Sequence, residues 1–80
     1  MKGDIRAQYR WTDGWLLAAI ALASGNRPAL LWEIIAAGDA LNHAIFTDEE
    51  IESGLARLTQ GGWITERNGT FLVTTLFKRR

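Results

Sequence analysis

An Asn-Gly pair near the end of the chain, Asn68-Gly69, constrains the fold more than any other feature of the sequence. Asn-Gly between two runs of alternating apolar residues favours a two-residue type I′ turn, because both turn positions need positive φ angles. The flanking runs, 63–67 and 70–74, are therefore predicted to form a β-hairpin. Pairing across such a turn sets Glu66 opposite Phe71.

This register sorts the apolar side chains of the hairpin onto its two faces. One face collects three of them: Ile64, Phe71 and Val73. The other face carries two: Trp63 and Leu72. The first set is expected to cover a core, which leaves the second set without an assigned partner.

The first of three predicted helices runs from about residue 13 to 24. Thr12 is placed to cap it, Asp13 suits its first turn, and Gly25 suits its end. One stripe of this helix is apolar: Trp15, Ala19 and Leu22. The opposite side is apolar as well: Leu17, Ile20 and Ala21. We therefore expect both sides of the helix to be covered.

A second helix is predicted from Pro28, a residue suited to the first helical position, to about Asn42. Its core stripe consists of Leu31, Ile34, Ile35, Gly38 and Leu41. Gly38 in mid-helix indicates that another helix crosses closely there. The outward face is poor in charge: Ala29, Trp32, Glu33, Ala36, Ala40 and His43.

The third helix has the clearest start signal. Thr47 and Glu50 fit a capping box, and Phe46 with Ile51 fits a hydrophobic staple, so the helix is expected to begin at Asp48. Its buried stripe is predicted to be Ile51, Leu55 and Leu58. The pair Gly61-Gly62 ends it.

The composition is that of one small globular domain. Eighty residues, 48% of them hydrophobic and 22% charged, suffice for a single core. We expect residues 1–11 to form an N-terminal arm and residues 12–80 to form the domain. The chain has no cysteine, so neither a disulfide nor a thiolate metal site supports the core.

Hydropathy and net charge indicate whether the chain is expected to have a membrane or a phosphate-bearing partner. The longest apolar stretch, residues 15–23, is under half of the roughly 20 residues that a bilayer requires, and no signal-peptide pattern is present. We therefore expect a cytoplasmic protein with no membrane partner. Nine basic and nine acidic residues cancel, so the whole molecule has no long-range attraction to phosphate.

The order of helix, helix, tight turn, helix and hairpin resembles the winged helix-turn-helix superfamily. The stretch Glu50-Ile51-x3-Leu55-x2-Leu58-x2-Gly61-Gly62-Trp63-Ile64 is similar to its third helix running into the wing, and Phe71-x-Val73-Thr74 is similar to the second wing strand. The resemblance covers about residues 12–77. It implies an α+β, mostly α fold: a three-helix bundle with a C-terminal β-hairpin wing. Members of the superfamily include transcription regulators and proteins that bind only other proteins.

The residues present argue against an enzyme. One histidine, no cysteine and no phosphate-cradling glycine loop leave no converging catalytic groups, so no catalytic, cofactor-binding or metal-ligating residue is assigned and no cofactor is expected. Asp39 and His43, four residues apart, fit a local helix pair better than a metal site.

A DNA-binding transcription regulator is one of two functions that remain. Its contacts would come from the third helix, the wing and the basic tail: Ser53, Ala56, Arg57, Gln60, Arg67, Lys78, Arg79 and Arg80. Against this role stand the acidic residues at the start of that helix: Asp48, Glu49, Glu50 and Glu52. They would set carboxylates against phosphates in a groove where protein contacts are normally basic.

The other function is a regulatory protein-interaction or homodimerisation module, and the sequence favours it. The observation behind it is surplus apolar surface on the first helix, the second helix and the far face of the wing. The residues assigned to this interface are Leu17, Ile20, Trp32, Ala36, Trp63 and Leu72. A domain this small has difficulty covering all of them, and exposed tryptophans mark interfaces.

Overall fold

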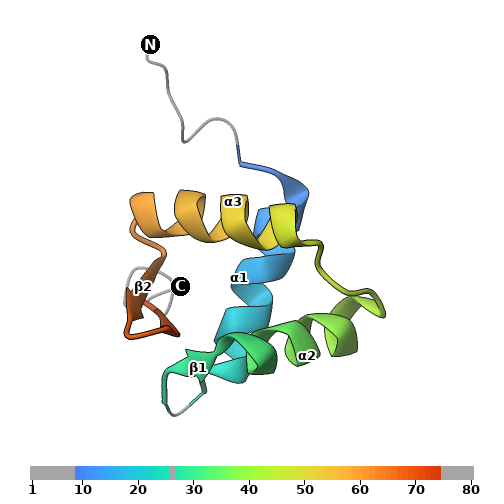
Figure 1. The fold of residues 1–80 in the computed structure, drawn as a ribbon, viewed down its shortest axis with the longest axis horizontal. Coiled ribbons are helices and arrows are strands. Elements are labelled where there is room, and N and C mark those ends of the chain that lie inside the picture. Colours follow the sequence, from blue (N-terminus) through green and yellow to red (C-terminus); the bar gives the residue numbers. More distant parts are fainter. Residues whose placement is uncertain (1–8, 26, 75–80) are drawn as a thin grey trace.

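Three helices followed by a β-hairpin form the domain, as the computed structural model shows for residues 9–25 and 27–74 (Figure 1). The elements in chain order are α1 (Trp11–Ala23), β1 (Ala29–Leu30), α2 (Leu31–Asn42), α3 (Asp48–Gln60), β2 (Ile64–Arg67) and β3 (Thr70–Val73). Helix α1 packs against both other helices, and the small sheet closes one end of the bundle. The predicted α+β fold class, with winged-helix-like topology, is confirmed.

The hairpin has the predicted register. Ile64 pairs with Val73 and Glu66 pairs with Phe71 in an antiparallel ladder. The turn residues Asn68 and Gly69 have φ angles of 54° and 81°, as a type I′ turn requires.

A third strand joins this sheet that the sequence did not predict. Ala29 of β1 pairs with Phe71 of β3, which gives the strand order β1-β3-β2. The prediction that Pro28 opens the second helix is therefore wrong, because the chain first makes this short strand and α2 begins at Leu31. The carboxylate of Glu33 accepts from the backbone N–H of Leu30 at 2.9 Å and supports the later start.

Helix α3 begins where the capping box predicts. The hydroxyl of Thr47 accepts from the backbone N–H of Glu50 at 3.1 Å, and the Glu50 carboxylate accepts from the backbone N–H of Thr47 at 2.9 Å. Both residues of the predicted staple, Phe46 and Ile51, are buried in the core. Local sequence thus fixes both the start and the angle of entry of this helix.

Helix α1 begins two residues earlier than predicted, and Thr12 is not its cap. Thr12 lies inside the helix and is buried. The carboxylate of Asp13 instead accepts from the backbone N–H of Arg10, the N-cap residue, at 3.0 Å. Two residues predicted to lie in the arm are part of the domain, because Trp11 is helical and the hydroxyl of Tyr9 donates to the carbonyl of Arg57 at 3.5 Å.

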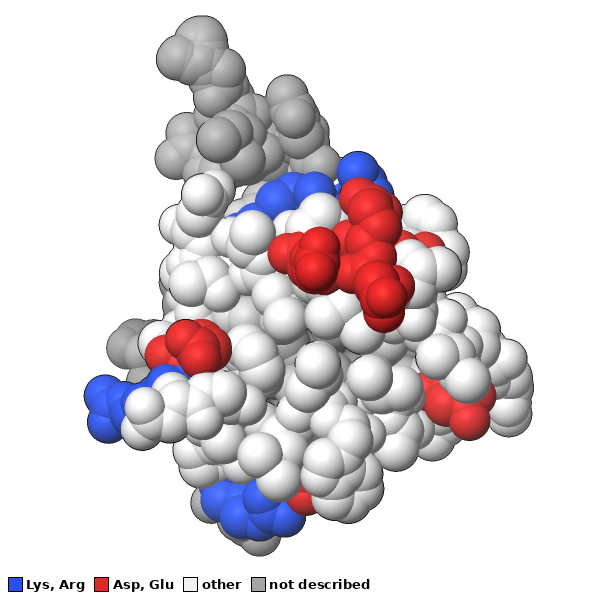
Figure 2. Space-filling view, viewed as in Figure 1, with Lys and Arg blue, Asp and Glu red and all other residues white. Residues whose placement is uncertain are grey.

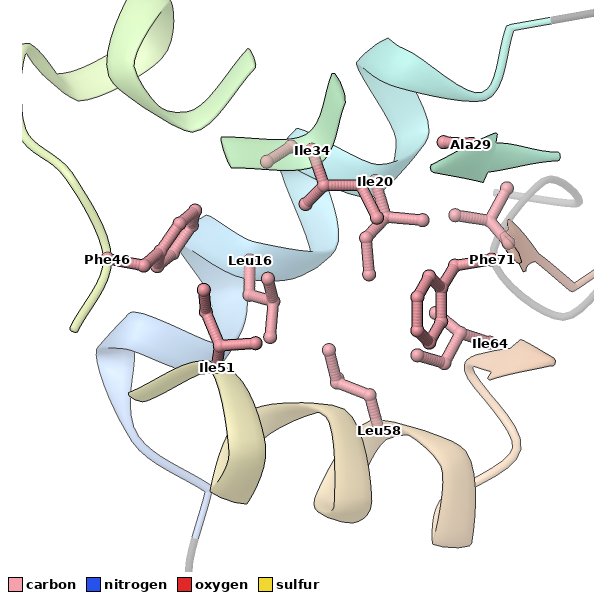
Figure 3. Packing of buried hydrophobic residues seen from close by; sticks show 11 residues of the cluster. Leu16, Ile20, Ala29, Ile34, Phe46, Ile51, Leu58, Ile64 and Phe71 are labelled. Carbon is pink, nitrogen blue, oxygen red and sulfur yellow. The ribbon is translucent and has the colours of Figure 1, made fainter. Parts of the chain in front are cut away.

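The core lies where all three helices and the sheet meet (Figure 3). Its buried hydrophobic residues are Leu16, Ala19, Ile20, Ala29, Ile34, Phe46, Ile51, Leu58, Ile64, Phe71 and Val73. Ile20 is among them with no exposed surface, so its prediction as an interface residue is wrong. Leu22, which was expected to be covered because both sides of this helix were, is 57% exposed, since the buried face of α1 is formed by Leu16, Ala19 and Ile20.

Two helical glycines allow elements of the core to approach closely. A Cβ at Gly38 would overlap the ring of Phe46, so the close neighbour predicted there is an aromatic side chain of the following loop. A Cβ at Gly54 of α3 would lie 2.7 Å from a methyl carbon of Leu16 and 3.0 Å from the carboxylate of Asp13. Gly54 therefore sets how closely α1 and α3 pack.

Candidate functional site: the outer face of helix α1

The outward surface of α1 is apolar along its whole length. Its two polar side chains, Thr12 and Asp13, both point inward and are buried. The exposed residues follow one another at helical spacing and are Trp11, Gly14, Ala18 and Leu22. We call these four residues the α1 face. A solvated helix normally turns its polar side chains outward, so this arrangement is reversed.

Trp11 is the largest exposed group of the α1 face, with 72% of its surface accessible. Its ring stacks on Trp15, with centroids 5.9 Å apart and planes 11° from parallel. Trp15 in turn stacks on Phe46 at 3.8 Å and donates from its indole nitrogen to the carbonyl of Gly38 at 2.9 Å. Trp11 is therefore held against a fixed ring and presents its outer surface to solvent.

A shallow apolar pocket of about 270 Å³ lies beside the α1 face, and Gly14 of that face is one of its lining residues. Leu17 lines it from α1, and Tyr9, Leu58 and Trp63 line it from the other elements. Two of the predicted interface residues, Leu17 and Trp63, thus meet here, both half-buried. Nothing in their sequence positions, 46 residues apart, indicated that they would share a pocket.

Three of the other predicted interface residues lie on separate surfaces, and the fourth, Ile20, is buried. Trp32 and Ala36 are exposed on α2, where the charged Asp39 is exposed beside them. Leu72 is half-buried and lines a separate groove on the wing, together with residues that include Thr65 and Arg67. The six predicted residues therefore form no single surface.

A buried ion pair joins α1 to α3. Asp13, 2% exposed, accepts from Nε of Arg57 at 2.6 Å and from Nη2 at 2.8 Å. Burial by itself raises the pKa of Asp13, but hydrogen bonds from the Arg57 side chain and the Arg10 backbone, together with the charges of both arginines, hold that pKa below its ordinary value of 3.8. The carboxylate therefore stays ionised and fixes both the start of α1 and its packing on α3.

This ion pair was missed by the sequence reasoning. Asp13 and Arg57 are 44 residues apart and neither has a local pattern that marks a partner. The only available signal was the position of Asp13 in a segment otherwise free of charge, where an acid needs either solvent or a cation.

The residues predicted to contact nucleic acid also lie on separate parts of the structure. Arg57 is held by Asp13 and also donates to the hydroxyl of Ser53 at 3.0 Å, so two of the predicted readers face each other. Ala56 and Gln60 are exposed on α3, and Arg67 is exposed on the wing. The predicted tail contacts Lys78, Arg79 and Arg80 lie outside the described residues.

Acidic side chains gather over the N-terminal end of α3 (Figure 2). Glu49 is paired with Arg10 at 3.0 Å, and Asp48 and Glu52 are exposed beside it. Within residues 9–25 and 27–74 there are four arginines and no lysine against eight acidic residues. Three of these arginines are in ion pairs, and Arg67 alone has no ion pair to another described residue.

The described part of the chain holds no cluster of three or more potential metal ligands. None of its helices has the length and apolar character needed to cross a bilayer. No protein-family model, no curated protein and no solved structure matches this chain. Because a fold of this kind serves many functions, we argue function from the surface of the domain.

Proposed function

We propose that this domain is a non-catalytic protein-interaction module and that the α1 face is its interaction surface. One observation carries the proposal: the two polar side chains of α1 are buried while Trp11 and Leu22 are exposed. Exposed apolar area of this kind is unfavourable in water, and free energy is gained when a partner covers it. Tryptophan is also one of the residues most enriched at interface centres.

The face of α2 is a less suitable surface, although Trp32 is almost as exposed as Trp11, at 67%. Asp39 is exposed on the same side of α2, and His43 is exposed directly after the end of the helix. A partner that covered Trp32 would therefore also have to satisfy or avoid these polar groups. The α1 face imposes no such requirement.

DNA reading by α3 is the second candidate, favoured by the winged-helix-like topology and by the exposed Arg67. Its helix would bring Asp48, Glu49 and Glu52 toward phosphates, and this repulsion opposes entry into the groove. The one arginine of α3, Arg57, would first have to leave its buried partner Asp13. Phosphate contacts would then depend on the wing and on the basic tail, which supports weak, non-specific binding only.

Site-specific photo-crosslinking in cells that make the protein tests this proposal. A photoreactive benzophenone amino acid replaces Trp11 in one variant, Trp32 in a second and Ala56 in a third. We expect protein adducts from position 11, and neither protein nor DNA adducts from position 56. Position 32 is the matched control, because the native tryptophans at 11 and 32 are similarly exposed.

DNA adducts from position 56 would contradict the proposal and favour the α3 reader. Protein adducts that arise from position 32 and not from position 11 would move the interaction surface to α2. A protein adduct of any identity at position 11 supports the proposed function.

A further inference from the structure

We infer that the partner of the α1 face is a second copy of this chain, bound through an antiparallel α1–α1 contact across a two-fold axis. This inference rests on the proposed function and names the occupant of the surface. It follows from three properties of α1: a glycine that no neighbour within the described domain requires, the absence of charge on the exposed face, and the spacing of large and small residues along that face.

Gly14 is the first argument. Of the three glycines inside helices, Gly38 and Gly54 are each required by a close neighbour, Phe46 in one case and Leu16 in the other. Gly14 is exposed, and apart from its chain neighbours and the backbone of its own helix no described atom lies within 4 Å of where its Cβ would be. A helical glycine disfavours the helix relative to alanine, so its use here points to a close approach from outside the described domain.

Charge is the second argument. In a two-fold contact the same patch meets itself, so a charged residue near the axis faces its own copy. A surface that binds a different protein has no such restriction and usually carries charges that select the partner. The α1 face carries no charged residue between Trp11 and Leu22, since Asp13 is turned inward. This composition suits self-association.

The spacing is the third argument. Gly14 and Ala18 lie symmetrically about the middle of the stripe, while Trp11 and Leu22 lie at its two ends. When two copies of α1 cross antiparallel, Gly14 of one copy meets Ala18 of the other, so the helix axes can approach closely. Trp11 of one copy then covers Leu22 of the other, and both large exposed side chains lose contact with water.

The size of the surface sets the expected affinity. A specific interface buries about 800 Å² on each partner, whereas α1 has 13 residues and is only about 20 Å long. A contact built mainly on one helix falls below that area. We therefore expect a dimer that dissociates in the micromolar range.

The test is an alanine-to-glutamate series on the full chain, one variant for each helix. Ala18 on α1, Ala36 on α2 and Ala56 on α3 are all exposed, so each variant adds the same charge to a solvated helix position. Sedimentation velocity across micromolar concentrations is expected to show a monomer–dimer equilibrium for the parent. Ala18→Glu should weaken the dimer about tenfold or more, because each copy then sets a carboxylate against the apolar Gly14 region of the other, with the second carboxylate close by across the axis. Ala36→Glu and Ala56→Glu should leave it unchanged.

Cysteine crosslinking tests the antiparallel geometry separately, since the chain has no native cysteine. A disulfide requires Cα atoms within about 7 Å of each other. Mixing Gly14→Cys with Ala18→Cys under mild oxidation should give the mixed disulfide dimer in preference to either homodimer. Preferential Gly14→Cys or Ala18→Cys homodimers would overturn the antiparallel register.

A monomeric parent at every concentration would overturn the inference. Protein adducts at position 11 in cells would then still support the proposed function, with a different protein as partner. The absence of such adducts would contradict both the proposed function and this inference. A dimer that Ala36→Glu dissociates and Ala18→Glu does not would assign self-association to α2 and likewise overturn the α1 contact.

Discussion

Replacement of Ile20 by alanine is expected to lower the free energy of unfolding by about 2–5 kcal/mol, the range for truncating a buried isoleucine. Ile20 is fully buried among side chains from α1, α2 and the sheet (Figure 3). A chain of this length has a total stability of only about 4–12 kcal/mol. Urea denaturation followed by tryptophan fluorescence, at concentrations below dimer formation, measures the loss.

Leu22→Ala is the matched control, two residues further along the same helix. Because Leu22 is 57% exposed, its truncation should change the unfolding free energy by no more than about 0.5 kcal/mol. Equal losses from both variants would mean that the rotation of α1 shown by the structure is incorrect. A larger loss from Leu22→Ala would mean that the side of α1 that carries Leu22 faces the core.

Replacement of Asp13 by alanine is expected to lower the unfolding free energy by about 3–5 kcal/mol, because it leaves the largely buried guanidinium of Arg57 without its counter-charge. The same change removes the acceptor for the Arg10 N–H at the start of α1. Glu49→Ala serves as the control, because it breaks the exposed Arg10–Glu49 pair between the same two regions. An exposed pair contributes little to stability, so Glu49→Ala should cost much less than Asp13→Ala.

The contribution of Asp13 should also depend on pH in a defined direction. Its pKa in the folded protein lies below its ordinary value of 3.8, so the folded state favours the ionised carboxylate. The resulting stabilisation is fully present above that ordinary pKa and is lost as the pH falls through the folded-state pKa. The difference in unfolding free energy between the parent and Asp13→Ala should therefore be constant near neutral pH and shrink in this acidic range. A difference that grows on acidification would contradict the assignment.

The parts of the fold that the sequence predicted correctly are those determined by interactions between residues close together in the chain. The turn residues Asn68 and Gly69 set the hairpin register through their own φ angles, and Thr47 with Glu50 sets the start of α3 through two short hydrogen bonds. These interactions join residues at most three positions apart. Neighbouring residue types are therefore enough to predict them.

The errors concern interactions between distant parts of the chain. Strand β1 exists because Ala29 pairs with Phe71. Helix α1 starts at Trp11 with the Asp13 carboxylate accepting from the Arg10 backbone, and the same carboxylate binds Arg57 of α3. Leu55, predicted to be fully buried, is half-buried. An apolar residue can only be assigned to the core or the surface of an all-apolar helix once its neighbours are placed, and α1 has no polar stripe to indicate which side faces water.

The candidate site was predicted only in outline. Surplus apolar surface on the first helix was expected, but Ile20 was assigned to it and Trp11 was left in the arm. The structure reverses both assignments, since Ile20 is buried and Trp11 is 72% exposed. Weak or absent DNA binding by the acidic helix α3 stays a prediction, and the Asp13–Arg57 pair adds a second physical reason for it.

Dilution of the isotope-labelled protein, followed by NMR, tests most directly whether the α1 face binds a second copy. Spectra recorded from millimolar to low micromolar concentration report each backbone amide and each tryptophan indole. The account predicts concentration-dependent shifts at Trp11, Gly14, Ala18 and Leu22, with unchanged signals from Ala56 and Gln60 on α3. Shifts confined to α2 or α3, or spectra that do not change with concentration, would contradict it.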